Sequence, residues 1–307
     1  MLQDLTNIDS LIKAYIDDLD RKEITKDSYK RTLFRFRDYL CNNKLFSPKS
    51  RNVIEYKEYL SKKLGAAAIQ KTVVVLRGFF EYLALNDLYP NILVGIRGAK
   101  VTKGMKRNTL QIDDLEKLIF ISKSKVSSIT TLRDHVIFML LCTTGLRTIE
   151  VERANIDDLS IIGDTPILYV QGKGRDDRAE YVKLSNEMLS LIEEYLQARS
   201  DSYEPLFITH GHVSYGSRIR TRSIRAMVKE LLYDADMYDK NVSAHSLRHF
   251  VCSEILRSGG SLEQAQQVLR HKDISTTQIY NHSLSRMDNN SELEVSKKVF
   301  MKEKENG

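Results

Sequence analysis

Side chains that bind anions, transfer protons or act as nucleophiles are spaced through the second half of this 307-residue chain. Arg147 follows a glycine turn in TGLRTIEV, and Lys173 lies in a glycine-flanked turn between two β-like segments. In HSLRH, His245 and Arg248 are three residues apart, which places both on one face of a helix.

A further histidine and a tyrosine follow in VLRHKDISTTQIY, where His271 and Tyr280 stand nine residues apart. Arginine and lysine bind anions, histidine transfers protons and tyrosine can form covalent intermediates, so together these residue types suit nucleophilic chemistry on an anion. Each feature alone has an ordinary structural explanation. An arginine near a helix end is usually an ion-pair partner, a lysine in a turn is usually solvated, and HSLRH could begin a surface helix.

In this order, Arg…Lys…His-x-x-Arg…His…Tyr, the residues resemble the signature of the tyrosine recombinases, the family of site-specific recombinases and phage-type integrases. The resemblance covers residues 111–287, whereas the first domain resembles the family's core-binding domain only in size, position and charge. It implies an enzyme that cleaves and rejoins DNA through a 3′-phosphotyrosyl intermediate and a Holliday junction.

The resemblance assigns catalytic roles to the basic residues and the tyrosine. Arg147 and Arg248 would bind the non-bridging oxygens of the scissile phosphate, because guanidinium groups match phosphate bidentately. Tyr280 would attack the phosphorus. Because a free phenol has a pKa of about 10, it needs a proton acceptor, and His245 is the candidate.

The remaining roles belong to supporting residues. Lys173 would protonate the departing 5′ oxygen, His271 would bind the phosphate or orient the tyrosine, and Glu150 would orient active-site groups. Because a phosphotyrosine conserves the energy of the phosphodiester, and no P-loop is present, we expect no metal, no ATP and no other cofactor. One departure is Leu269-Arg270-His271, where the family often has Leu-Gly-His. Arg270 would either add a phosphate contact or replace a small residue at a tolerant position.

Hydrophobic periodicity predicts the elements that must position these residues. Four amphipathic segments fill the first 90 residues, among them 66–85 with an apolar stripe of Ile69, Val73, Leu76, Phe80 and Leu83. A second domain begins near residue 111, with a buried helix at 131–142 and a hairpin of two β-like segments at 167–170 and 180–184. Further helices are predicted at 187–199, 223–233, 246–258 and 262–269, the second of these capped by Ser223.

The predicted fold is mainly α, with a four-helix core-binding domain and an α-rich catalytic domain that carries a small antiparallel β-sheet. By resemblance, the two would form a C-shaped clamp around DNA. The expected divisions are 1–96 for the core-binding domain, 97–110 for a basic linker, 111–287 for the catalytic domain and 288–307 for a tail. The tail would dock on a neighbouring protomer.

Basic residues are concentrated where DNA contact is expected. Residues 1–110 contain 21 lysines and arginines against 12 acidic residues, a net charge of +9, whereas the remainder carries −3. A polyanionic partner is therefore favoured. Candidate DNA-binding residues lie in the linker and in the basic stretch 215–229, which leads into the helix predicted at 223–233: Arg97, Lys100, Lys103, Lys106, Arg107, Arg218, Arg220, Arg222 and Arg225.

Several other classes of protein fit the sequence less well. Three widely spaced cysteines without a C-x-x-C pair indicate neither a zinc site nor a disulfide framework. MLQDLTNIDS does not read as a signal peptide, and no apolar run reaches the ~18 residues of a membrane span, so we expect a cytoplasmic protein with no membrane partner. A glycine between His210 and His212 argues against a HUH nuclease. A DDE transposase needs three separated carboxylates that bind metal ions, and nothing in the sequence singles out such a set.

The resemblance implies double-stranded DNA with inverted-repeat core sites as the partner, bound by a homotetramer on two sites or by a heterotetramer with a paralogue. Integration and excision of a mobile genetic element, or cointegrate resolution, is the favoured role. Alternatives are the resolution of chromosome or plasmid dimers by a Xer-type enzyme, DNA relaxation by a type IB topoisomerase, and DNA binding without catalysis.

Overall fold

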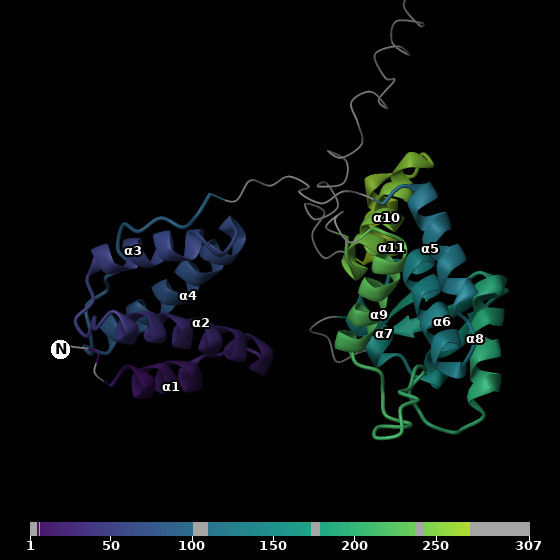
Figure 1. Cartoon of the computed structure of the whole chain (residues 1–307), viewed down its shortest axis with the longest axis horizontal. Coiled ribbons are helices and arrows are strands. Elements are labelled where there is room, and N and C mark those ends of the chain that lie inside the picture. The colour runs from purple at the N-terminus through teal and green to yellow at the C-terminus, as the bar shows by residue number, and fades with distance from the viewer. Residues whose placement is uncertain (1–4, 6, 101–109, 173–178, 238–241, 271–307) are drawn as a thin grey trace, which may run out of the picture. The chain divides into compact units, whose positions relative to one another are not determined.

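The computed structural model describes residues 5, 7–100, 110–172, 179–237 and 242–270 (Figure 1). The chain divides into two compact units, Met1–Lys103 and Gly104–Gly307. This boundary lies within residues 97–110, where the sequence predicts a linker. Among the described residues, no helix is both long enough and apolar enough to cross a membrane.

The described part of the first unit contains four helices, as the periodicity predicts. Its last helix buries the whole apolar stripe of Ile69, Val73, Leu76, Phe80 and Leu83, so the 3.6-residue period correctly identified the inward face. Other apolar side chains, including the fully buried Tyr56, complete a core that belongs to this unit alone. The helices are α1 (Ile8–Asp18), α2 (Glu23–Asn42), α3 (Ser50–Ser61) and α4 (Ala66–Leu85).

The second unit packs its helices around α6 (Ile129–Thr144), which is buried along most of its length and contacts α8 and α10. This burial explains why the segment is apolar on nearly all sides. The surrounding elements are α5 (Ile112–Ser124), α7 (Thr148–Arg153), the 3₁₀ turn η1 (Ile156–Asp158), α8 (Asn186–Arg199), α9 (Thr221–Asp234), α10 (Ala244–Arg257) and α11 (Leu262–Leu269).

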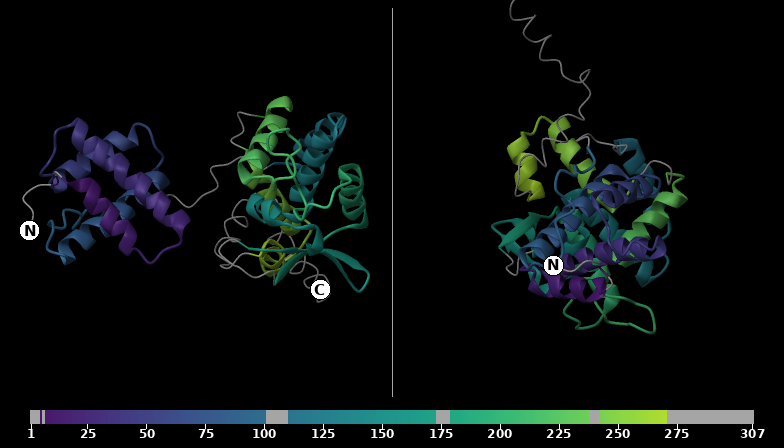
Figure 2. Two further views of the ribbon diagram at one scale, coloured as in Figure 1. Left: turned by 90° about the horizontal axis from the view of Figure 1, so that it is seen from below. Right: turned by 90° about the vertical axis from the view of Figure 1, so that its left-hand side faces the viewer.

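A small antiparallel sheet lies at one edge of the second unit (Figure 2). Its strands, β1 (Leu159–Ile162), β2 (Thr165–Val170) and β3 (Glu180–Lys183), are ordered β1-β2-β3. Leu168 in the central strand pairs with Leu159 on one side and Val182 on the other. The two predicted β-like segments are β2 and β3. The sequence did not predict β1, which is mostly exposed and lacks the alternation that marks a half-buried strand.

The start of α9 corrects one local prediction. The helix begins at Thr221, so Ser223 lies inside its first turn and does not cap it. The cap comes from another helix, because the carboxylate of Glu152 in α7 accepts hydrogen bonds from the Thr221 amide at 2.6 Å and its hydroxyl at 2.7 Å. A carboxylate at this position also interacts favourably with the positive end of the helix dipole.

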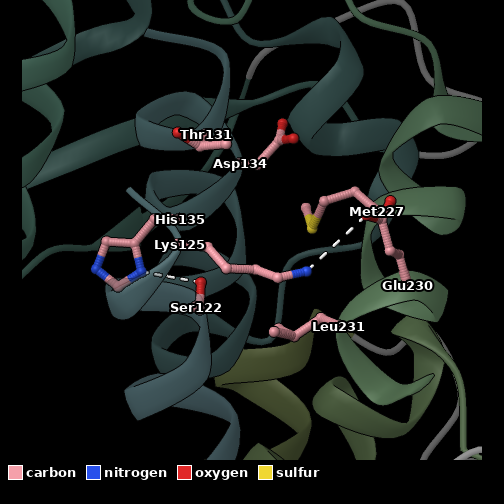
Figure 3. Close-up of a pocket in the computed structure, with 8 residues that line it drawn as sticks. All are labelled: Ser122, Lys125, Thr131, Asp134, His135, Met227, Glu230 and Leu231. Carbon is pink, nitrogen blue, oxygen red and sulfur yellow. Dashed lines mark hydrogen bonds and ion pairs between the residues drawn. The ribbon is translucent and has the colours of Figure 1, made fainter. Parts of the chain in front are cut away.

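Polar residues join α5, α6 and α9 around a cavity of about 280 Å³ (Figure 3). The buried His135 ring is hydrogen-bonded through Nδ1 to the Ser122 hydroxyl at 3.0 Å. Across the cavity, Lys125 pairs with Glu230 at 3.9 Å and also with Asp234. Burial, followed by the nearby Lys123, lowers the pKa of His135, so this histidine is neutral in the folded protein near neutral pH.

Replacing His135 by asparagine is expected to weaken the loss of stability in mild acid. In the unfolded chain a histidine binds its proton with a pKa of about 6.5, whereas the folded protein resists that proton. Stability from this group is therefore complete above pH 6.5 and falls below it, by at most about 1.4 kcal/mol per pH unit. Urea unfolding at pH 7.5, 6.5 and 5.5 measures the slope. The exposed His212→Asn variant should keep the wild-type slope, and an unchanged slope in His135→Asn would contradict the prediction.

Candidate active site

A glycine turn at the end of α6 places the first candidate residue. Gly145 has a left-handed φ of 63°, and a Cβ there would lie 2.6 Å from Cδ2 of Leu269 and 3.4 Å from Val251. Both the backbone angle and the close approach of α10 and α11 therefore favour glycine. Two residues later, Arg147 occupies the N-cap position of α7.

A buried carboxylate holds Arg147 in place. Glu150, which is fully buried, accepts a hydrogen bond from the Arg147 amide at 2.8 Å and another from its Nη1 at 2.7 Å. Burial alone would raise the pKa of Glu150, but the charges of Arg270 and Arg147 outweigh that effect and lower it. The residue is therefore an ionised anchor. The Arg147 side chain remains 27% exposed, so it is only partly enclosed.

The motif HSLRH forms the first turns of α10. Arg248 is only 1% exposed, and its Nη1 donates to the carbonyl of Gly145 at 2.5 Å while its Nη2 donates to the carbonyl of Leu269. His245 is exposed, and its ring lies against that of His249 with the centroids 4.5 Å apart. The i, i+3 spacing thus puts both residues on one helix, but the arginine faces the core and the histidine faces solvent.

The two arginines converge on the end of α11. Arg248 donates to Leu269, and Nη2 of Arg147 donates to the neighbouring carbonyl of Arg270 at 3.3 Å. Two guanidinium groups, separated by about one hundred positions in sequence, are thus anchored at adjacent residues. Arginine is the side chain best suited to bind phosphate, and of these two Arg147 keeps part of its side chain exposed whereas Arg248 is enclosed. Lys173, His271 and Tyr280 lie outside the described residues.

Comparison with known proteins decides the family. The phage integrase family model matches residues 108–287. The chain belongs to this family. It is a tyrosine recombinase, and its function is site-specific DNA recombination. The residues that carried the resemblance all lie within the matched segment.

Sequence alignments with named relatives cover most of this chain. It is 27% identical over 286 residues to tyrosine recombinase XerD of Listeria innocua, which covers 90% of this chain and 93% of that protein. It is 28% identical over 235 residues to tyrosine recombinase XerC of Leptospira interrogans, with coverage of 75% and 72%.

Solved structures show the same fold. The XerH recombinase bound to a palindromic difH substrate superimposes with a TM-score of 0.72 at 22% identity, covering 89% of this chain and 79% of that one. The integrase of the Tn1549 transposon, in complex with transposon right end DNA, superimposes with a TM-score of 0.68 at 16% identity, covering 88% and 94%.

One predicted DNA-binding residue, Arg218, makes structural contacts within the second unit. Nη1 of Arg218 donates to the carbonyls of Glu152 and Ala154, both at 3.0 Å, and its Nη2 donates to the Asn155 side chain at 2.6 Å. This guanidinium therefore closes the carboxyl end of α7. A DNA contact by Arg218 stays a prediction.

Other predicted DNA-binding residues are exposed. Arg222 and Arg225 lie on successive turns of α9, and Arg220, with its side chain 74% exposed, pairs with Glu152 at 3.4 Å. In the first unit Arg97 and Lys100 are also exposed. The remaining linker residues of this set lie outside the described residues: Lys103, Lys106 and Arg107.

Two contacts of the site were not foreseen from the sequence. Arg153 in α7 donates to the carbonyl of Gly172 at 3.2 Å, and so ties that helix to the chain just before Lys173. Arg270 places Nη2 2.9 Å from Glu150, and its side chain is only 5% exposed. The two roles weighed for Arg270 from the sequence, a phosphate contact or a replacement at a tolerant position, stay predictions. Long-range pairs such as these carry no local sequence signal.

Proposed function

We propose that the recombinase cleaves one DNA strand per protomer by attack of Tyr280 on the scissile phosphate. The observation that carries this proposal is the convergence of Arg147 and Arg248 on the end of α11, because it gathers two fixed positive charges at one place in the family domain. The charges would stabilise the negative charge that grows on the non-bridging oxygens in the transition state. His271 follows this anchor point directly in the sequence, and the expected nucleophile follows nine residues later.

The cleavage step transfers the scissile phosphoryl group from the 5′ oxygen of the DNA to Tyr280. The phenolic oxygen of Tyr280 forms a bond to phosphorus as the bond between phosphorus and the 5′ oxygen breaks. His245 accepts the phenolic proton, and its exposed position on α10 leaves it open to a substrate. Lys173 gives a proton to the 5′ oxygen, and His271 hydrogen-bonds the phosphate or orients the tyrosine. Religation reverses the step with a 5′ hydroxyl as the nucleophile.

Energy conservation in the covalent intermediate supports a reaction without ATP, and the two arginines support one without a metal ion. The phosphotyrosyl ester replaces the phosphodiester at nearly equal energy, so that resealing needs no external source. Two guanidinium groups supply the charge that divalent ions supply in other phosphoryl-transfer enzymes.

For assembly we propose a C-shaped clamp on inverted-repeat core sites, with four protomers, identical or paired with a paralogue, on two sites. Exposed basic residues in both units support DNA contact through phosphates: Arg97, Lys100, Arg220, Arg222 and Arg225, together with Lys103, Lys106 and Arg107 from the sequence. The tail 288–307 would dock on a neighbouring protomer through its apolar residues. Native gels on DNA with one site or two sites test this assembly, and a complex limited to one site would contradict it.

The biological role we favour is integration and excision of a mobile genetic element, or cointegrate resolution. Xer-type resolution of chromosome or plasmid dimers is the second candidate, because relatives named XerC and XerD align over most of this chain. The two roles predict different targets. The first predicts sites at the ends of an element, whereas the second predicts a single site on the chromosome or plasmid.

The test is a suicide-substrate assay with the full-length protein. Nicked duplexes from the gene's own neighbourhood trap the intermediate, because a short fragment carrying the 5′ hydroxyl diffuses away. We expect a denaturant-resistant protein–DNA adduct in 5 mM EDTA without nucleotide, with the same yield when Mg²⁺ is added. Peptide mapping by mass spectrometry should place the nucleotide on Tyr280. DNA binding without an adduct on any substrate would favour a non-catalytic protein, and an adduct only with Mg²⁺ would refute metal independence.

A further inference from the structure

We propose that Arg270 is a positioning residue for strand cleavage, holding the guanidinium of Arg147 in its phosphate-binding orientation through the carboxylate of Glu150. This inference rests on the proposed function, in which Arg147 binds the scissile phosphate. It assigns a role to a side chain whose hydrogen bonds within the described residues go to Glu150 and to the carbonyl of Val268.

The backbone conformation of Arg270 is one that favours glycine. The residue ends α11 with a φ of 54°, in the left-handed region that glycine adopts most easily. A side chain at this position is disfavoured unless other contacts compensate. Here the compensation is visible, because the arginine folds back under the end of its own helix with its side chain only 5% exposed.

A chain of hydrogen bonds, called the relay below, links Arg270 at the end of α11 to Arg147 through Glu150. Nη2 of Arg270 lies 2.9 Å from Oε2 of Glu150, and that same oxygen accepts the Arg147 amide at 2.8 Å. The other oxygen, Oε1, accepts Nη1 of Arg147 at 2.7 Å. Nη1 of Arg270 is fixed by the carbonyl of Val268 at 2.8 Å. Every member of this relay is therefore held from at least two directions.

A second contact joins Arg270 and Arg147 directly through the backbone. The carbonyl of Arg270 accepts Nη2 of Arg147 at 3.3 Å, while the preceding carbonyl of Leu269 accepts Arg248. The left-handed turn at Arg270 thus sets the position of carbonyls that hold both candidate phosphate-binding arginines. The side chain of Arg270 therefore acts on the Arg147 guanidinium through Glu150, and its backbone carbonyl accepts a hydrogen bond from that guanidinium directly.

Charge gives the relay a pH dependence. Among the described residues, the charged groups that face Glu150 are Arg147 from the start of its own helix and Arg270 from α11. Burial raises the pKa of Glu150, and the positive charge of Arg270 is the first of the influences that offset it. Without Arg270, the carboxyl is expected to take up a proton at higher pH. A protonated carboxyl would bind Arg147 more weakly.

The test compares Arg270→Gly, which suits the left-handed backbone and removes the side chain, with Arg270→Lys, which keeps the charge. Single-turnover cleavage of a suicide substrate at saturating protein is measured from pH 6 to 9, and DNA affinity is measured separately. We expect Arg270→Gly to cleave about tenfold to a hundredfold more slowly, the scale of a misplaced catalytic group. DNA affinity should stay within about twofold, the acid limb of the pH profile should move to higher pH, and Arg270→Lys should recover most of the rate.

Arg257→Gly is the matched control, because Arg257 also ends a helix and pairs with a carboxylate, Glu254, at 3.6 Å. It should keep the wild-type rate and pH profile. Circular dichroism confirms that each variant is folded at the assay temperature. A wild-type rate and profile in Arg270→Gly, or a lysine variant no faster than the glycine variant, would overturn the inference alone. Absence of any adduct in the wild type would overturn the proposed function itself, and the inference with it.

Discussion

Replacing Tyr280 by phenylalanine is expected to abolish the covalent protein–DNA adduct while DNA affinity stays within about twofold of wild type. The substitution removes a single hydroxyl group, and no other atom of that side chain can form an ester with phosphorus. Without the nucleophile, charge stabilisation by Arg147 and Arg248 has no reaction to accelerate. Denaturing gels of suicide-substrate reactions measure the adduct, and fluorescence anisotropy with the same duplex measures affinity.

Tyr215→Phe is the control, since Tyr215 is an exposed tyrosine of the same unit. This variant should form the wild-type amount of adduct. An adduct in Tyr280→Phe would show that another tyrosine is the nucleophile, and peptide mapping would identify it. Parallel loss of adduct and of DNA binding would instead point to a role for the hydroxyl in holding the domain together.

Much of the fold could be predicted because it depends on local periodicity. The stripe of α4, the buried α6 and the helix α11 all follow from residue spacing within a single segment. By contrast, α7 spans only six residues and β1 only four, mostly exposed, so neither contains enough turns or alternations for a periodic signal. Their existence depends on neighbours in space, such as β2 for β1.

The candidate site divides in the same way. Arg147 and Glu150 are three residues apart, so their pairing is a local consequence of helix geometry. The pair between Glu150 and Arg270 spans 120 positions, and the bonds of Arg218 to the end of α7 span more than 60. Composition could not distinguish Arg218 from its exposed neighbour Arg222, because only the packed structure determines which basic side chain turns inward.

Replacing Arg248 is expected both to slow DNA cleavage and to lower the stability of the fold. Its terminal nitrogens hold the carbonyls of Gly145 and Leu269 inside the protein, and we assign the same guanidinium to the scissile phosphate. Lysine at this position would keep the charge but lose the planar fork. We therefore expect Arg248→Lys to cleave DNA roughly 10²–10³-fold more slowly, the effect of removing one fixed donor to a developing oxyanion.

The same substitution should lower the free energy of unfolding by about 1–3 kcal/mol for each buried carbonyl that loses its donor. Urea unfolding measures the free energy of unfolding. Single-turnover cleavage, at a temperature where each variant is folded, measures the rate of DNA cleavage. Arg257→Lys, on the exposed end of the same helix α10, should change neither quantity appreciably. A destabilised Arg248→Lys that cleaved DNA at the wild-type rate would make Arg248 a structural residue only. The charge at the phosphate would then have to come from Arg147 and from residues outside α10.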